Sequence, residues 1–220
     1  MVGETLPVKI LTLRLIPNLS PGLAKSLGVS SHCRAIGLIS TDSDDVTYMA
    51  LDEATKTANV EVVYARSLYA GAANASTAFA GEIIGVLAGP TPAEVAGGLR
   101  GAQDFIESGV GFKSANEAGD VVYLAHCVSR TGSYLSASAH VPVGQAIAYL
   151  VAPPVEAIEG LDAALKASDV ELTEFFAPPT ETNFAGGFLT GSQSACQAAC
   201  DAFAEAVIQV ARKPKDLGGM

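Results

Sequence analysis

Hydrophobic and polar residues alternate near the start of the chain, which is the pattern of a β-strand that buries one face. Leucine occupies every second position of the segment 11–15, with polar residues between. The segment 122–126 repeats this pattern in the second half of the chain. The segments 35–40 and 146–151 are almost entirely apolar, and we expect each to be a strand buried on both faces.

Signals for helix starts follow each of these buried strands. The polar residues 43–45 offer capping oxygens to one helix, and the proline pair at 153–154 sets the first turn of its counterpart. A capping box at 91–94 predicts a second helix in the first half, and the segment 192–194 starts its counterpart. Apolar stripes give these last helices a buried face, formed by Val95, Leu99, Ala102 and Ile106 in one and by Ala199, Phe203, Val207 and Val210 in the other.

The two halves also share sequence. The segment 51–61 is echoed at 161–171, with Leu, Asp, Ala, Lys, Val and Glu in register. Two copies are too few for a solenoid, so a duplicated small domain is the better interpretation. We therefore predict two domains, residues 1–110 and 111–220, of the α/β (α+β) class. In each, helices should cover a mostly antiparallel sheet.

Charge and hydropathy exclude several classes of partner. The net charge of −10 disfavours nucleic acid, because lysine and arginine supply most of the affinity for phosphates. The apolar segment 7–16 is interrupted by polar residues and has no cleavage site, and no long uncharged apolar run exists elsewhere. We expect a cytosolic protein that binds neither nucleic acid nor membrane.

The cysteines form no CxxC pair, so we expect free thiols. Cys196 and Cys200 are four apart on a predicted helix, which favours buried small side chains over metal ligands. His126 and Cys127 are adjacent on a predicted strand and point to opposite faces, so they do not readily share a metal. We expect neither a metal nor a cofactor.

Longer strings carry a family resemblance. The segment DAALKASDVEL at 162–172, preceded by AIAYL at 146–150, resembles the signature of bacterial microcompartment shell domains. Two such domains, each opening with a strand that the common shell domain carries last, resemble the tandem, circularly permuted class. The ethanolamine-utilisation type is indicated by further matches over nearly the whole chain, at 37–48, 62–72, 128–135 and 189–193.

This resemblance implies a homotrimer whose six domains mimic a hexagonal tile. Such a tile packs beside other microcompartment shell proteins around ethanolamine-degrading enzymes. The resemblance also implies small-molecule pores, including a gated central one. A cyclic trimer of two-domain chains fits these implications, since it closes without forming a filament.

A long loop is the first candidate for function. The segment 66–80 joins two predicted strands and is rich in small residues, and long loops in compact domains are usually functional or disordered. Its counterpart at 177–184 is stiffened by two prolines. In the resembling family such loops surround the trimer axis, which makes Ser67, Leu68, Tyr69, Ala70 and Gly71 the candidate gate.

Asp42, Asp44 and Asp45 are the densest cluster of carboxylates. Their residue type suits a metal, acid/base work or an organic cation, but the cluster alone favours a simple helix cap formed by Asp44 or Asp45. The resemblance implies an ethanolamine site, with carboxylates and an aromatic ring for the ammonium and polar groups for the hydroxyl. Carried over position by position, its residues are Asp44, Asp45, Glu82, Phe112, Thr182, Asn183 and Phe184.

Three functions remain open at this point. The first is a structural and transport tile, and the second is a trimeric small-molecule sensor of ferredoxin-like type. The third is a hydrolase or lyase that uses Asp42, Asp44 and Asp45 around a divalent metal. No serine or cysteine has a base at motif spacing and no phosphate-binding glycine loop occurs, so we do not expect an enzyme.

Overall fold

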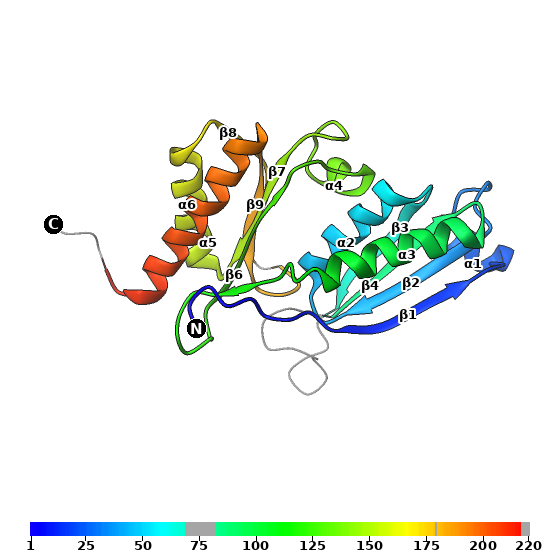
Figure 1. The fold of residues 1–220 in the computed structure, drawn as a ribbon, viewed down its shortest axis with the longest axis horizontal. Coiled ribbons are helices and arrows are strands. Elements are labelled where there is room, and N and C mark those ends of the chain that lie inside the picture. The colour runs from blue at the N-terminus through cyan, green and yellow to red at the C-terminus, as the bar shows by residue number, and fades with distance from the viewer. Residues whose placement is uncertain (69–81, 179, 217–220) are drawn as a thin grey trace. The chain divides into compact units, whose positions relative to one another are not determined.

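The computed structural model describes residues 1–68, 82–178 and 180–216, which form two compact units (Figure 1). The N-terminal unit comprises residues 8–110 and 132–135. The C-terminal unit comprises residues 1–7, 111–131 and those from 136 onward. Two short segments, 1–7 and 132–135, thus belong to a different unit from the neighbouring part of the sequence.

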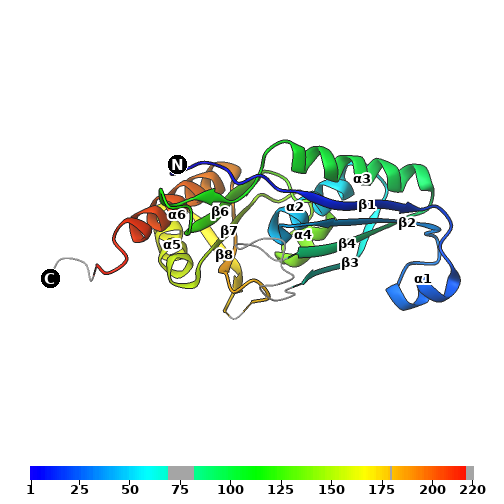
Figure 2. The ribbon, with the colours of Figure 1, turned by 90° about the horizontal axis from the view of Figure 1, so that it is seen from below.

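The N-terminal unit is a four-stranded antiparallel sheet covered by helices. Figure 2 shows its strands in the order β1 (Ile10–Ile16), β2 (Ala35–Thr41), β4 (Glu82–Gly89) and β3 (Glu61–Leu68). Its helices are α1 (Pro21–Leu27), α2 (Asp44–Thr57) and α3 (Pro92–Glu107). The helices α2 and α3 pack against each other and against the sheet (Figure 1). The predicted strand at 11–15 and the buried strand at 35–40 are confirmed.

The C-terminal unit is built in the same way. Its antiparallel sheet has the order β5 (Lys113–Ser114), β6 (Val122–Val128), β7 (Ile147–Ala152), β9 (Ala185–Gly191) and β8 (Val170–Phe176). The helices α5 (Pro154–Ala167) and α6 (Gln193–Arg212) pack together on this sheet (Figure 1). A short helix, α4 (Ser133–Ser138), begins in the segment that belongs to the N-terminal unit.

The duplication seen in the sequence is a duplication of topology. The order β1-α1-β2-α2-β3-β4-α3 recurs as β6-α4-β7-α5-β8-β9-α6, and the strand order β1-β2-β4-β3 recurs as β6-β7-β9-β8. Even an irregularity is repeated. The pairing of β3 with β4 shifts between Val62 and Tyr64, and that of β8 with β9 shifts between Leu172 and Glu174. The predicted α/β class with antiparallel sheets is confirmed.

The starts of α3 and α6 follow the predicted signals with one difference. At α3 the Thr91 hydroxyl accepts the Glu94 N–H at 3.2 Å, and at α6 Ser192 accepts the Ala195 N–H at 3.1 Å. Glu94 does not complete the capping box. Its carboxylate accepts the backbone N–H of Asn59 at 2.9 Å instead, so it ties α3 to the connection that leads into β3.

Glycines allow the helices to approach the sheet closely. A Cβ at Gly37 of β2 would lie 2.8 Å from Leu99 of α3, and a Cβ at Gly85 of β4 would lie 2.8 Å from Leu51 of α2. Because real side chains do not tolerate such distances, a Cβ at either position would force the facing leucine to move. Both leucines are buried, at 5% and 0% exposed.

The structure agrees with the expected behaviour of the cysteines of α6. Cys196 and Cys200 are free, buried and part of the core beneath α6. Burial raises the pKa of the Cys196 thiol to about 11 and raises that of Cys200 as well. Among the described helices, none combines the length and the apolar character needed to span a membrane.

Candidate functional site

The start of α2 carries two adjacent buried carboxylates. Asp44 and Asp45 are 5% and 8% exposed, and they are the first two residues of the helix. One oxygen of Asp44 accepts the Asp45 N–H at 2.9 Å, and the other accepts the hydroxyl of Ser67 at 2.7 Å. The positive end of the helix dipole favours negative charge at this position. Asp44 therefore joins the start of α2 to the end of β3.

A set of hydroxyls fixes the turn that precedes these carboxylates. Thr41 and Thr47 are fully buried, and their hydroxyl oxygens lie 2.6 Å apart. Thr41 also accepts the Ser43 N–H at 3.1 Å, and Thr47 donates to the Ser43 carbonyl at 2.7 Å. Ser43 is the N-cap residue, but its side chain makes no cap hydrogen bond. The expectation that Asp44 or Asp45 caps α2 is wrong, because both lie inside the helix.

Asp42 is held apart from this pair. One oxygen of its carboxylate accepts the backbone N–H of Lys9 at 2.8 Å, next to β1. Asp44 is instead bound by β3, on the other edge of the sheet. Among the described residues, the three aspartates do not form a group whose oxygens could share a metal ion. This arrangement disfavours the metal-dependent hydrolase or lyase.

The C-terminal unit supplies an aromatic pair. The rings of Phe112 and Phe184 are 5.5 Å apart between centroids and tilted by 34°. Both are buried, at 4% and 9% exposed. Phe112 follows Gly111, where a Cβ would lie 2.7 Å from the Leu6 carbonyl oxygen, so glycine is required there. The Leu6 N–H donates to the Phe112 carbonyl at 2.8 Å, which holds the backbone at Phe112.

A tight turn before β9 positions the other predicted residues of this unit. The Asn183 N–H donates to the Thr180 carbonyl at 3.2 Å, and the Thr180 hydroxyl donates to the Phe184 carbonyl at 2.8 Å. Asn183 has a φ of 63°, a left-handed conformation that asparagine tolerates better than most residues. Its side chain is exposed, and that of Thr182 is half-buried. The turn thus places Thr182 and Asn183 beside the aromatic pair.

The remaining predicted residues flank the segment 69–81. Glu82 begins β4 and its backbone pairs with that of Leu68, the last residue of β3. Ser67, the residue before Leu68, donates a hydrogen bond to Asp44. The other candidate gate residues, Tyr69, Ala70 and Gly71, lie outside the described residues. Of the predicted ethanolamine site, Asp44, Asp45 and Glu82 belong to the N-terminal unit, and Phe112, Thr182, Asn183 and Phe184 belong to the C-terminal unit.

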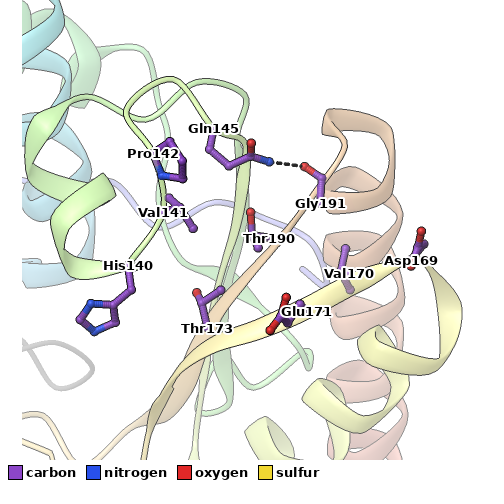
Figure 3. Close-up of a pocket in the computed structure, with 10 residues that line it drawn as sticks. All are labelled: His140, Val141, Pro142, Gln145, Asp169, Val170, Glu171, Thr173, Thr190 and Gly191. Atoms are coloured by element: carbon purple, nitrogen blue, oxygen red, sulfur yellow. Dashed lines mark hydrogen bonds between the residues drawn. The ribbon is translucent and has the colours of Figure 1, made fainter.

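Two further features were not predicted from the sequence. The first is a cavity of about 570 Å³ in the C-terminal unit, bordered by the segment after α4 and by β8 and β9 (Figure 3). There the Gln145 amide donates to the Gly191 carbonyl at 2.8 Å. His140, at a φ of 56°, lies 3.3 Å from the carboxylate of Glu174. None of the predicted ethanolamine residues lines this cavity.

The second feature is a cluster of His32, Cys33 and Glu61 in the N-terminal unit. The Cys33 thiol lies 3.4 Å from a carboxylate oxygen of Glu61 and donates to it. Burial and this carboxylate raise the pKa of Cys33 to about 11. Burial works against ionisation of Glu61, but hydrogen bonds from Ser30 and Cys33 outweigh it and lower the Glu61 pKa. The adjacent His32-Cys33 pair is a visible signal, but its distant carboxylate partner cannot be assigned from sequence.

Known proteins share this fold and much of this sequence. A family model described as the BMC domain matches residues 35–109. The bacterial microcompartment shell protein EutL of Clostridium perfringens is 64% identical over 97% of this chain and 99% of its own length. EutL of Escherichia coli is 55% identical over 93% of this chain and 94% of its own. The crystal structure of the ethanolamine utilization protein EutL from Leptotrichia buccalis has a TM-score of 0.93 and 58% identity, covering 98% of this chain and 100% of that one.

Proposed function

The chain belongs to the EutL family of bacterial microcompartment shell proteins, and from that membership we propose that it forms a trimeric, pore-containing tile that binds ethanolamine. It is a structural component of the ethanolamine microcompartment shell and not an enzyme. The finer statements concern its domains, its assembly, its pores and its ligand. Each has its own support.

The duplicated topology supports a pseudohexameric trimer. We propose that residues 1–110 and 111–220 are the two shell domains, so that a trimer has six similar edges to offer to other shell proteins. Apolar side chains are exposed on α5 and at the sheet edge formed by β8, and exposed apolar groups often mark protein contacts. They are Val155, Ile158, Leu165, Leu172 and Phe175.

The sequence of the segment 66–80 supports a gated central pore. Small residues dominate it, and Tyr69 supplies one bulky side chain that could close an aperture. Ser67 connects the start of this segment to Asp44 by a 2.7 Å hydrogen bond. If the segment opens and closes, its amide hydrogens exchange faster than those of the rest of the chain outside the termini. Strong protection from hydrogen exchange throughout 66–80 would argue against the gate.

The observation that carries the ethanolamine site is the pair of buried carboxylates at the start of α2. Two adjacent buried carboxylates concentrate negative charge at one place, which suits a cationic ligand. A ligand with an ammonium group can supply a charge-assisted hydrogen bond there, and the polar groups of Thr182 and Asn183 suit its hydroxyl. Phe112 and Phe184 add an aromatic surface that can contact the cation. Glu82 completes the proposed set as a further negative charge.

Calorimetry with ethanolamine tests this site. Asp45→Asn removes a charge partner of the ammonium while keeping the size of the side chain, so we expect binding at least about tenfold weaker. Asp42→Asn is the matched control, because it removes the same charge three residues away. The Asp42 carboxylate accepts the backbone N–H of Lys9 instead. We expect this variant to bind ethanolamine like the parent.

Two analogues separate the contributions of the ligand groups. Ethylamine keeps the ammonium and loses the hydroxyl, whereas ethylene glycol keeps hydroxyls and lacks the charge. We expect weakened binding of the first and none of the second. Undiminished ethanolamine binding by Asp45→Asn, or equal losses in Asp45→Asn and Asp42→Asn, would remove the proposed site.

A further inference from the structure

His32, Cys33 and Glu61 bring three kinds of metal-binding atom together. One imidazole nitrogen, the thiol sulfur and one carboxylate oxygen all lie within 4.8 Å of one another. His32 and Cys33 lie in the connection before β2, and Glu61 is the first residue of β3. Cys33 is 8% exposed, Glu61 is half-buried and His32 is exposed. The cluster thus has a buried floor and one side open to solvent.

The spacing of the sulfur and the carboxylate oxygen fits a tetrahedral zinc site. Zinc binds a thiolate sulfur at about 2.3 Å and a carboxylate oxygen at about 2.0–2.2 Å, which places the two about 3.5 Å apart at a tetrahedral angle. The sulfur of Cys33 and the oxygen of Glu61 are 3.4 Å apart. We propose that His32, Cys33 and Glu61 bind Zn²⁺, with water as the fourth ligand on the open side of His32.

The chemistry of the donors selects zinc over the common hard cations. Mg²⁺ and Ca²⁺ prefer sets made of oxygen alone, whereas a thiolate and an imidazole suit Zn²⁺. Binding breaks the S–H bond of Cys33, forms an S–Zn bond and releases the proton to solvent. The hydroxyl and backbone N–H of Ser30 hydrogen-bond the Glu61 carboxylate, and such neighbours orient a ligand before the metal arrives.

A metal at this site would link two parts of the N-terminal sheet that are separated by β4. In the N-terminal sheet β4 lies between β2 and β3, so the connection before β2 and the start of β3 are not direct neighbours. A metal joining Cys33 to Glu61 would link segments 28 residues apart in the sequence. Because zinc binds this folded arrangement, its presence raises the temperature of unfolding.

A second histidine–cysteine pair in the same chain provides the matched control. His126 and Cys127 are adjacent on β6, where neighbouring side chains point to opposite faces. The Cys127 thiol is directed at the Gln193 carbonyl at 3.7 Å. Within the described part of the chain, this pair belongs to no group of three potential ligands.

The test is a titration of the full-length, reduced and chelator-treated protein with Co²⁺ and Zn²⁺. We expect one Co²⁺ per chain, a sulfur-to-cobalt charge-transfer band in the near ultraviolet, and displacement of Co²⁺ by Zn²⁺. Cys33→Ser loses the band, and Cys127→Ser keeps it. His32→Gln and Glu61→Gln each bind Zn²⁺ at least about tenfold more weakly. At one Zn²⁺ concentration, the unfolding temperature of the parent and of Cys127→Ser rises more than that of His32→Gln.

His32→Gln keeps the test decisive if Cys33→Ser misfolds. Because His32 is exposed, its replacement leaves the fold intact, which circular dichroism checks even if Cys33→Ser folds poorly. The proposal is overturned if the parent shows no charge-transfer band, if Cys127→Ser removes it, or if His32→Gln binds Zn²⁺ as tightly as the parent. Ethanolamine binding is measured separately, so failure of this site leaves the proposed function untouched.

Discussion

Asp52 shows at the scale of single residues how one sequence motif takes two roles. It is fully buried, and its two oxygens accept the N–H groups of Gly132 at 2.7 Å and Leu135 at 2.8 Å. It thereby satisfies backbone donors at the start of α4. Its counterpart in the repeat, Asp162, is exposed and binds Lys166 one turn along its own helix. The repeat therefore predicts the two helices but not the different hydrogen-bond partners of the two aspartates.

Tyr134 lies in the segment whose backbone Asp52 binds. Because Tyr134 is partly buried, we expect the protein to lose stability at high pH. Burial raises its pKa to about 12, Arg66 lowers it in part, and Asp52 raises it further. The unfolded chain releases this proton near the ordinary tyrosine pKa of about 10, so its stabilising effect is complete below that pH and is lost between about pH 10 and 12. The difference amounts to on the order of 3 kcal/mol, because each pH unit corresponds to about 1.4 kcal/mol.

Denaturant unfolding of the parent and of Tyr134→Phe across this range tests the prediction. The phenylalanine variant cannot ionise, so its stability falls less between about pH 10 and 12 than that of the parent. Tyr64→Phe, at a position that is 40% exposed, is the control and follows the parent. The same alkaline decline in Tyr134→Phe as in the parent contradicts the assignment.

At the scale of elements, the sequence predicts strands and helices well because their patterns are local. Segment 35–40 is strand β2, and the stripe from Val95 to Ile106 is the buried face of α3. Leu15 was predicted to be buried but is 39% exposed, because β1 lies at an edge of the sheet. Neither the strand order nor the shared shift at Val62 and Leu172 has a local signal, since both arise from pairing between distant segments.

We expect alanine substitutions at three glycines, two in strands and one in a helix, to give a graded series of stability changes. A Cβ at Gly186 of β9 would overlap the carbonyl oxygen of Leu150, and backbone cannot move aside easily. We expect Gly186→Ala to cost more than about 3 kcal/mol, and Gly85→Ala about 1–3 kcal/mol because it meets the flexible side chain of Leu51. Gly22 of α1 has open space, so Gly22→Ala is neutral or slightly stabilising. Urea unfolding measures the series, and an equal effect at all three positions would contradict it.

At the scale of the whole molecule, the predicted ethanolamine site depended on the family resemblance more than on residue patterns. Local reasoning assigned Asp44 and Asp45 to a helix cap, and the structure places them inside α2. It also missed the link from Ser67 to Asp44, because the two are 23 residues apart. The pairing of Phe112 with Phe184 is likewise invisible in the sequence, since a contact between distant residues leaves no periodic pattern.

The last prediction concerns assembly. The exposed apolar residues of α5 and β8 lose contact with water if they meet another chain, and a cyclic trimer buries such surfaces without leaving a growing end. Sedimentation at micromolar concentration is therefore expected to show a species of three 22.4 kDa chains. Asp45→Asn should sediment in the same way, because its buried carboxylate lies at the start of α2 and not on α5 or β8. Extended hexagonal sheets in electron micrographs would support a shell tile, and discrete trimers alone would favour a sensor. A single chain of 22.4 kDa at this concentration contradicts the trimer itself.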